Sequence, residues 1–376
     1  MEETGNMTLE SLDHFDVITC GQSDNETLAI IGTVKFWFEG VFFMSFGVIG
    51  LISALTTVGI LTTRELRSHL FYQLLITLAI LDILYILCSV PTYSFDIFKW
   101  FHNNKTFHHV VSKFLYPLTP VTLHATIFLT IALTLERYIA VHRPFWFRNI
   151  NTSFNTCCRL AMYVLPAILL SFAFNYPKFS EVTVSDENDT LTFDMTEKRK
   201  SPNYLLYYTI SLLIHPTITT GIAPLAIHAF MNASILLKIH KSRLFRGITI
   251  GEEEEGNGRM SENNLAFVLV GVVVIHFVCH IPRFIFAIAA QSYISIMISC
   301  VEHGESFYPP LWIACGESVT AMFLLVKSSF NLLMYCFTLR RFKAKIGQIG
   351  HEGKRKITNY SRSNSVDSAE STFSEI

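Results

Sequence analysis

The sequence contains few charged residues for its length, and this shortage excludes most soluble proteins. Asp, Glu, Lys and Arg make up 16% of the 376 residues, whereas soluble chains contain about 25%. Apolar residues make up 51%, and phenylalanine alone occurs 32 times. The net charge is −1, so the chain has no overall basic excess with which to bind nucleic acid. This composition argues against a soluble enzyme and predicts a protein of the lipid bilayer.

The sequence also lacks the short motifs that would assign a reaction. It contains no zinc-protease helix, nucleophile elbow or phosphate-binding loop, so we do not expect an enzyme. An ion-coupled transporter or channel is the alternative class, because Asp82, Glu317 and Lys327 lie in apolar stretches and could line an ion path. Transporters commonly contain internal repeats, and we find none in this sequence.

Seven apolar stretches are long enough to cross a bilayer, which requires about 20 mostly apolar residues. Five contain no charged residue, and two contain one or two. The stretches are 40–63, 70–95, 114–135, 160–177, 201–237, 263–282 and 307–339. The sequence therefore predicts an all-α membrane protein, a seven-transmembrane helix bundle. No apolar leader precedes the first stretch, which is expected to act as its own insertion signal.

The basic residues predict the orientation, because lysine and arginine concentrate on the cytoplasmic side. With the N-terminus outside, the inner loops and the C-terminal tail contain most of the 29 lysines and arginines. We therefore expect an extracellular tail at 1–36, the transmembrane domain at 37–339 and a cytoplasmic segment at 340–376. Four glycosylation sequons then lie outside: Asn6, Asn25, Asn104 and Asn188.

The end of the cytoplasmic segment is polar and rich in serine, which predicts disorder. Phosphorylation there would add charge for a partner to read. A plain disordered end is the alternative interpretation. The candidate acceptors are Ser361, Ser363, Ser365, Ser368, Ser371, Thr372 and Ser374.

Ionisable residues within spans are expensive to bury unpaired, so each one suggests a function. Asp82 lies in the middle of span two, and Lys327 lies in the middle of span seven. We predict that they form a buried ion pair, with snorkelling of Lys327 to the surface as the alternative. Arg283 and Glu317 lie nearer the outer ends of spans six and seven, where they could pair with each other or face a ligand.

Several motifs together resemble the rhodopsin-like (class A) G-protein-coupled receptors. They are Leu78-Ala79-x-x-Asp82, Glu136-Arg137-Tyr138, Pro224, Cys279-His280-Ile281-Pro282 and Asn331-x-x-x-Tyr335, followed by Phe342 in a basic stretch like the family's short amphipathic eighth helix. Within that family, two further strings resemble invertebrate FMRFamide-type neuropeptide receptors. These strings are Tyr116-Pro117-Leu118-Thr119-Pro120 and Phe174-Asn175-Tyr176-Pro177-Lys178-Phe179.

The resemblance implies a switch at the inner end of the bundle. Arg137 would pair with Glu136 and with an acid at the base of span six, which counting back from Pro282 places at Glu262. An agonist favours an open state, in which span six swings outward and Arg137 contacts a heterotrimeric G protein. The other implied switch residues are Tyr138, Asn331 and Tyr335. The resemblance also implies a location in the plasma membrane and binding of receptor kinases and arrestin.

A ligand pocket that opens outward is implied as well. The aligned positions are Thr92, Asp96, Thr119, Leu123, His280, Arg283, Phe284 and Glu317. FMRFamide-like peptides end in Arg-Phe-amide, whose cation needs a carboxylate and whose rings need apolar partners. We expect Glu317 or Asp96 to supply the carboxylate; alternatively, Arg283 neutralises Glu317 and itself binds a ligand carbonyl. A receptor for another small peptide or a chemosensory ligand is the broader alternative, and no cofactor is implied.

The chain departs from the family pattern at the sodium site and at the usual disulfide. In relatives the span-two Asp binds sodium with polar groups of spans three and seven. Thr126 and Lys327 occupy those positions here, so a tethered ammonium would replace the ion. The usual disulfide between span three and the second outer loop cannot form, because 179–203 contain no cysteine. We predict a disulfide between Cys20 and Cys300 instead.

Two histidines of span six share a helix face. His276 and His280 are four residues apart, with Cys279 beside them, which is a spacing that can bind a metal ion. The sequence shows no carboxylate or other supporting partner for such a site. We therefore expect packing, or a hydrogen bond beneath the ligand, and no metal.

Overall fold

The computed structural model describes residues 25–63, 69–98, 104–180, 182–187, 190–195, 221–249, 257–293, 296, 300 and 308–338. The side chains of Asp96, of both strands and of 242–249, 257–269 and 331–338 lie outside this description. Residues 1–24, with Asn6 and Cys20, and residues 339–376, with the candidate phosphorylation sites, also lie outside it, as does Asn188. The last part of the predicted N-terminal tail, 25–36, is helical.

Helices occupy all seven predicted spans. Within the described part of the chain, six helices are long and apolar enough to cross a membrane, and the shorter apolar segment Val273–Ala289 supplies the seventh span. The first is continuous through α1 (Asn25–Lys35), the π-helix η1 (Phe36–Phe42) and α2 (Phe43–Leu61). The others are α4 (Leu70–Ile97), the π-helix η2 (Val111–Leu115) continued by α6 (Tyr116–His142), α8 (Thr156–Asn175), α10 (Ile222–Thr249), α11 (Asn257–Gln291) and α13 (Leu311–Thr338).

Six of these helices close into a ring around an apolar core. α2 packs against α4 and α13, α13 against α11, α11 against α10, α10 against α6, and α6 against α4. α8 packs against α6 and α4. One cluster of the core contains Phe71, Leu75 and Leu129. A second contains Tyr85 and Leu123. This arrangement confirms the expected seven-helix bundle and places α6 mainly against α4, α8 and α10.

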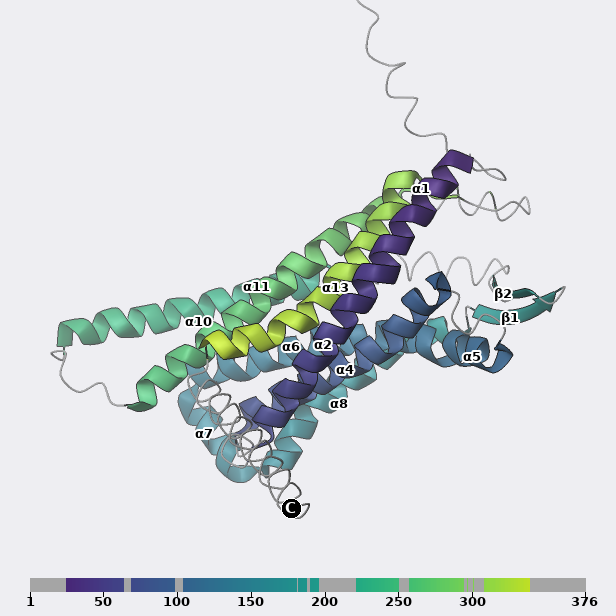
Figure 1. Ribbon diagram of the computed structural model, residues 1–376. Coiled ribbons are helices and arrows are strands. Elements are labelled where there is room, and N and C mark those ends of the chain that lie inside the picture. The colour runs from purple at the N-terminus through teal and green to yellow at the C-terminus, as the bar shows by residue number, and fades with distance from the viewer. Residues whose placement is uncertain are drawn as a thin grey trace, which may run out of the picture.

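Short elements connect the helices at the two ends of the bundle. They are α5 (Lys105–Val110), α7 (Pro144–Ser153), the 3-10 helix η3 (Tyr176–Ser180) and two antiparallel strands, β1 (Val182–Glu187) and β2 (Thr190–Met195). The hairpin lies at one end and α7 at the other (Figure 1). The hairpin is a small addition to the all-α architecture that we expected, and its β-branched residues favour extended backbone.

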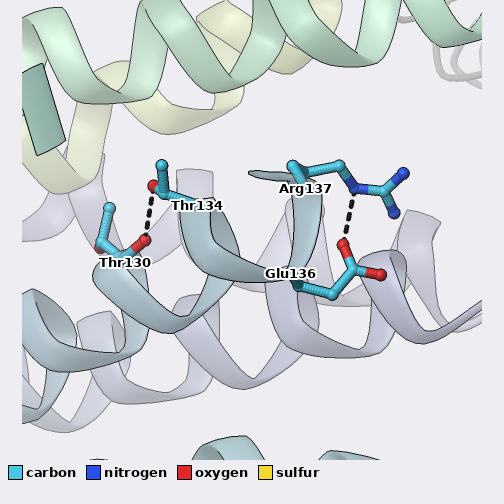
Figure 2. Close-up of polar contacts among 4 residues, drawn as sticks. All are labelled: Thr130, Thr134, Glu136 and Arg137. Carbon is cyan, nitrogen blue, oxygen red and sulfur yellow. Dashed lines mark hydrogen bonds and ion pairs between the residues drawn. The ribbon is translucent and has the colours of Figure 1, made fainter. Parts of the chain in front are cut away.

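Polar groups of the spans are largely satisfied within their own helices. The Thr134 hydroxyl donates to the Thr130 carbonyl at 2.8 Å, as Figure 2 shows. The Ser171 hydroxyl donates to the Ala167 carbonyl at 2.6 Å. Such bonds allow hydroxyl groups to lie in a medium that offers no water. Gly316 serves packing instead, because the ring of Phe286 in α11 occupies the space that a side chain at this position of α13 would need.

Candidate functional site

An ion pair with a buried carboxylate lies near the C-terminal end of α6. Glu136 and Arg137 are consecutive residues of the helix, and Arg137 Nε lies 2.8 Å from Glu136 Oε2 (Figure 2). Glu136 is 1% exposed. A buried carboxylate is expensive unless a cation compensates it, so the pair fixes Arg137 in its present direction. This is the first half of the predicted switch.

An aromatic ring provides a second restraint on Arg137. The guanidinium carbon lies 4.1 Å from the ring centroid of Phe71, near the start of α4. Phe71 is fully buried in the apolar core, so its ring has little freedom to move. A cation over a ring at this distance is attracted by the ring's electrons. The sequence alone did not identify Phe71, because it is one of 32 phenylalanines and nothing in its sequence neighbourhood distinguishes it.

The other predicted switch residues are placed by their helices. Pro282 lies inside α11. Tyr138 stacks on His142, with ring centroids 4.2 Å apart. Glu262 lies in α11, and Asn331 and Tyr335 lie in α13, with side chains outside the described part. The contact between Arg137 and Glu262 therefore stays a prediction.

Two opposite charges are buried in the middle of the bundle. Asp82 of α4 is 2% exposed and Lys327 of α13 is 4% exposed, which excludes snorkelling of Lys327 to the surface. The Lys327 ammonium donates a hydrogen bond of 3.1 Å to Thr126 Oγ1 in α6. The ammonium thus joins α13 to α6, two of the three helices that carry the predicted sodium-site positions. The ion pair with Asp82 stays a prediction.

Three buried histidines lie close together across α10 and α11. The rings of His276 and His280 are 4.1 Å apart and nearly parallel, and the His228 ring lies 5.3 Å from that of His276. His228 Nδ1 lies 3.3 Å from the Thr134 hydroxyl. Among the described residues, His276 and His280 have no hydrogen-bond partner for either ring nitrogen. The described residues also contain no group of three side chains able to hold a metal ion.

The end of the bundle opposite Arg137 holds a second set of charges. Arg283 of α11 lies within electrostatic range of Glu317 in α13 and of Tyr93 in α4. Glu39, in η1, accepts a hydrogen bond of 2.6 Å from the Ser318 hydroxyl through Oε1. Its backbone carbonyl accepts a second one, of 2.7 Å, from Ser94. Glu39 thus ties the first helix to α13 and α4.

The other predicted pocket residues are divided between this end of the bundle and the core. The hydroxyls of Thr92 and Thr119 donate to carbonyls of their own helices. Leu123 is buried in the second apolar cluster. Phe284 is half-buried. Asp96 lies in α4, but its side chain is outside the described part. The helices that carry Arg283 and Glu317, α11 and α13, pack against each other. The pairing of these two residues and the contribution of Asp96 stay predictions.

The structure describes some of the cysteines and two of the four sequon asparagines. Cys300 is disulfide-bonded, whereas Cys88, Cys157, Cys158, Cys279 and Cys315 are free. Cys20 lies outside the described residues, so its pairing with Cys300 stays a prediction. Asn25 and Asn104 are exposed. The Asn104 side chain also accepts a hydrogen bond of 3.1 Å from the Phe107 backbone N–H at the start of α5.

Comparison with known families decides what kind of bundle this is. The family model for the seven-transmembrane receptors of the rhodopsin family matches residues 53–315. The match extends over more than half of the chain and includes both the ion pair of α6 and the buried Asp82. This chain belongs to the rhodopsin family of seven-transmembrane receptors. It is a multi-pass membrane protein of a family of signalling receptors rather than enzymes.

Individual relatives of the receptor are distant. It is 24% identical over 329 residues to the FMRFamide receptor of Drosophila melanogaster, a match that covers 82% of this chain and 53% of the relative. It is 22% identical over 306 residues to a probable G-protein coupled receptor of Caenorhabditis elegans, covering 73% and 66%. The urotensin-2 receptor of Bos taurus is 22% identical over 300 residues, covering 76% and 70%. The chain thus spans about half the length of the fly receptor that it matches.

The buried histidines of the receptor lead to a prediction about its stability. Replacing His276 by Phe keeps an aromatic ring beside His280 and removes two polar nitrogens that no described residue bonds. Removing such groups is expected to stabilise a fold by about 1–3 kcal/mol. The Tm of the purified variant should therefore rise, measured by thermal unfolding in detergent. Ser171→Ala, which removes a hydroxyl that is hydrogen-bonded, serves as the control and should not raise Tm. A lower Tm for His276→Phe would contradict the account.

Proposed function

We propose that the receptor detects an extracellular neuropeptide, specifically an amidated FMRFamide-like peptide, and catalyses nucleotide exchange on a heterotrimeric G protein. The observation that carries the proposal is the buried Glu136–Arg137 pair at the inner end of α6, within a bundle of the rhodopsin family. A relative named as an FMRFamide receptor and one named as a urotensin-2 receptor support a peptide ligand.

The signal passes through a change in the population of two states. In the resting state Glu136 holds Arg137. In the open state the inner end of α11 moves outward, and Arg137 exchanges its internal partner for the C-terminal helix of a G-protein α subunit. Pro282 removes one backbone hydrogen bond of α11 and provides a point of bending. The peptide shifts this equilibrium only by its greater affinity for the open state. Glu262, Tyr138, Asn331 and Tyr335 complete the proposed switch.

The proposed orientation places the peptide and the G protein on opposite sides of the plasma membrane. The N-terminus and the glycosylation sites Asn6, Asn25, Asn104 and Asn188 face outward. The inner loops and 340–376 face the cytoplasm, where receptor kinases and arrestin would act on the serine-rich tail. The proposed disulfide from Cys20 to Cys300 would hold the N-terminal segment over the pocket.

The restraint by Phe71 leads to a prediction about resting activity. Phe71→Leu keeps an apolar side chain but removes the ring beneath the Arg137 guanidinium. The lost attraction is about 1 kcal/mol, so ligand-independent nucleotide exchange should rise about fivefold. It would be measured in membranes that contain G protein, normalised to surface receptor. Phe71→Tyr keeps the ring and should stay near the wild-type level. Equal rates for Phe71→Leu and wild type would show that the ring does not restrain Arg137.

Charge reversal separates the two candidate carboxylates for the ligand's cation. If Glu317 binds the terminal arginine of the peptide, Glu317→Lys should lower peptide potency about 100-fold or more. Asp96→Lys should then have a much smaller effect. The opposite ranking would assign the contact to Asp96. If instead Arg283 neutralises Glu317, Arg283→Gln should lower potency as much as Glu317→Lys does. Glu26→Lys, at the exposed start of α1, is the matched control.

The proposed function is tested with a panel of amidated peptides applied to cells that express the receptor. Calcium and cyclic-AMP responses to a peptide ending in Arg-Phe-amide, absent for the same peptide with a free C-terminal acid, would support it. A response only to other small peptides would keep the receptor class and reject the FMRFamide-like ligand. Silence toward every peptide, together with a response to small volatile or odorant molecules, would favour a chemosensory receptor.

A further inference from the structure

Helix α7 carries positive charge that its surroundings do not neutralise. Arg143 immediately precedes the helix and Arg148 lies within it, and both side chains are exposed. Neither arginine forms an ion pair with any described residue. No acidic residue occurs in the sequence between Glu136 and Glu181, so α7 and both of its flanks lack negative charge. The two cations are therefore available to an anion from outside the chain.

The same helix has an apolar face that the bundle covers only in part. Trp146, Phe147 and Ile150 share this face, because residues three and four apart are neighbours on a helix. Phe147 and Ile150 are half-buried, and the centroid of the Phe147 ring lies 5.7 Å from the guanidinium carbon of Arg159 in α8. Trp146 is 52% exposed. Thus α7 lies against the bundle along one edge of its apolar face, and the described residues leave Trp146 uncovered along the other.

The position of α7 brings both features to the level of the lipid headgroups. The helix connects α6, which ends at His142, to α8, which begins at Thr156, and both of these helices cross the membrane. It lies at the end of the bundle away from the hairpin (Figure 1). Tryptophan is enriched where headgroups meet acyl chains, and basic residues beside a membrane are attracted to anionic lipids. A basic helix with one apolar face is typical of segments that lie in this layer.

We propose that α7 docks on the cytoplasmic leaflet of the membrane and that Arg143 and Arg148 bind the headgroups of anionic lipids there. Trp146 enters the headgroup layer, and the two guanidinium groups donate hydrogen bonds to phosphate and carboxylate oxygens. Each arginine contributes about fivefold to the binding constant. The choice of leaflet rests on the proposed orientation, whereas the docking does not depend on the ligand or on the G protein. Because α7 follows α6 directly, docking fixes the end of α6 that carries Arg137 relative to the membrane.

Hydrogen exchange of the α7 backbone tests the proposal in full-length receptor reconstituted in lipid nanodiscs without G protein. The amides of α7 should exchange about fivefold or more slowly when the discs contain phosphatidylserine than when they contain phosphatidylcholine alone. Arg143→Gln combined with Arg148→Gln should abolish this difference between the lipids. Lys238→Gln combined with Lys241→Gln removes two exposed cations from α10 instead, and this matched control should keep it. Trp146→Ser should speed exchange in both lipids, because it removes the apolar contact and leaves the charges.

Three results would overturn the proposal. Equal exchange of wild-type α7 in the two lipids would show that anionic headgroups do not bind it. An equal loss in the α10 control would assign the effect to the total charge at this end of the bundle rather than to α7. Protection that appears only when G protein is added would assign the face to a protein partner. The wild type also gives an answer without any substitution, since high salt should abolish the difference between the lipids by screening the arginines.

Discussion

Glu136→Gln is expected to raise ligand-independent nucleotide exchange about tenfold. The substitution keeps the size of the side chain and removes the charge that holds Arg137 at 2.8 Å. A charge-assisted contact is about twice as strong as a neutral one, and a loss of about 1.4 kcal/mol from the resting state corresponds to tenfold in the population of the open state. The measurement is nucleotide exchange on G protein in membranes, without added peptide.

Two further substitutions serve as controls for Glu136→Gln. Glu136→Asp keeps the charge and should give much less activation than Glu136→Gln. Arg137→Ala removes the group that is proposed to contact the G protein, so exchange should fall below the wild-type level with or without peptide. An unchanged resting rate in a well-expressed Glu136→Gln variant would contradict the role of the pair as a restraint.

Lys327→Ser is expected to make the stability of the receptor depend on sodium. In the wild type the buried ammonium donates to Thr126 and lies in the same core as Asp82. On the proposal that it occupies the place of the ion, the wild-type Tm should be the same in sodium and potassium chloride at equal ionic strength. Replacing Lys327 by serine removes the cation, leaves oxygen atoms as possible ligands and opens space for an ion. A sodium ion could then bind the folded state and stabilise it.

The expected change in Tm has two parts, the cost of losing the ammonium and the gain from a sodium ion bound in its place. Removing one partner of a buried pair costs on the order of 3–5 kcal/mol, and bound sodium at ten times its Kd would return about 1.4 kcal/mol. The Tm of Lys327→Ser should therefore fall strongly in potassium chloride and less in sodium chloride. Lys327→Met, which fills the space with an apolar side chain, should fall equally in both salts. A wild-type Tm that depends on sodium would show that the ammonium does not replace the ion.

The bundle could be predicted from the sequence because charge and hydropathy identify the stretches that cross the membrane. They did not identify the residues at which the helices begin and end. The helix of the first span begins at Asn25, before the apolar run, and α10 continues to Thr249, well beyond Lys238. The membrane selects apolar residues, but a helix can extend beyond it because its backbone hydrogen bonds are made within the helix itself.

The site was predictable only where its residues are close in sequence. Glu136 and Arg137 are consecutive, so their pairing needed no knowledge of packing. The contacts of Arg137 with Phe71 and of Glu39 with Ser318 join separate helices. They depend on the rotation of each helix about its axis, which a π-helix such as η1 changes by widening one turn. Glu39 could have been identified as a candidate contact residue, because it is a charged residue at the start of an apolar run.

The role of Arg137 as a movable restraint is tested most directly by a distance measurement between the inner ends of α8 and α11. One spin label is attached to Cys157, which is exposed, with Cys158→Ser to leave a single site there, and another to Ser261→Cys near the start of α11. Glu136→Gln should shift the distance distribution toward longer values without peptide, because α11 is freed to move outward. A distribution identical to that of the wild type, in a variant with raised nucleotide exchange, would contradict the account.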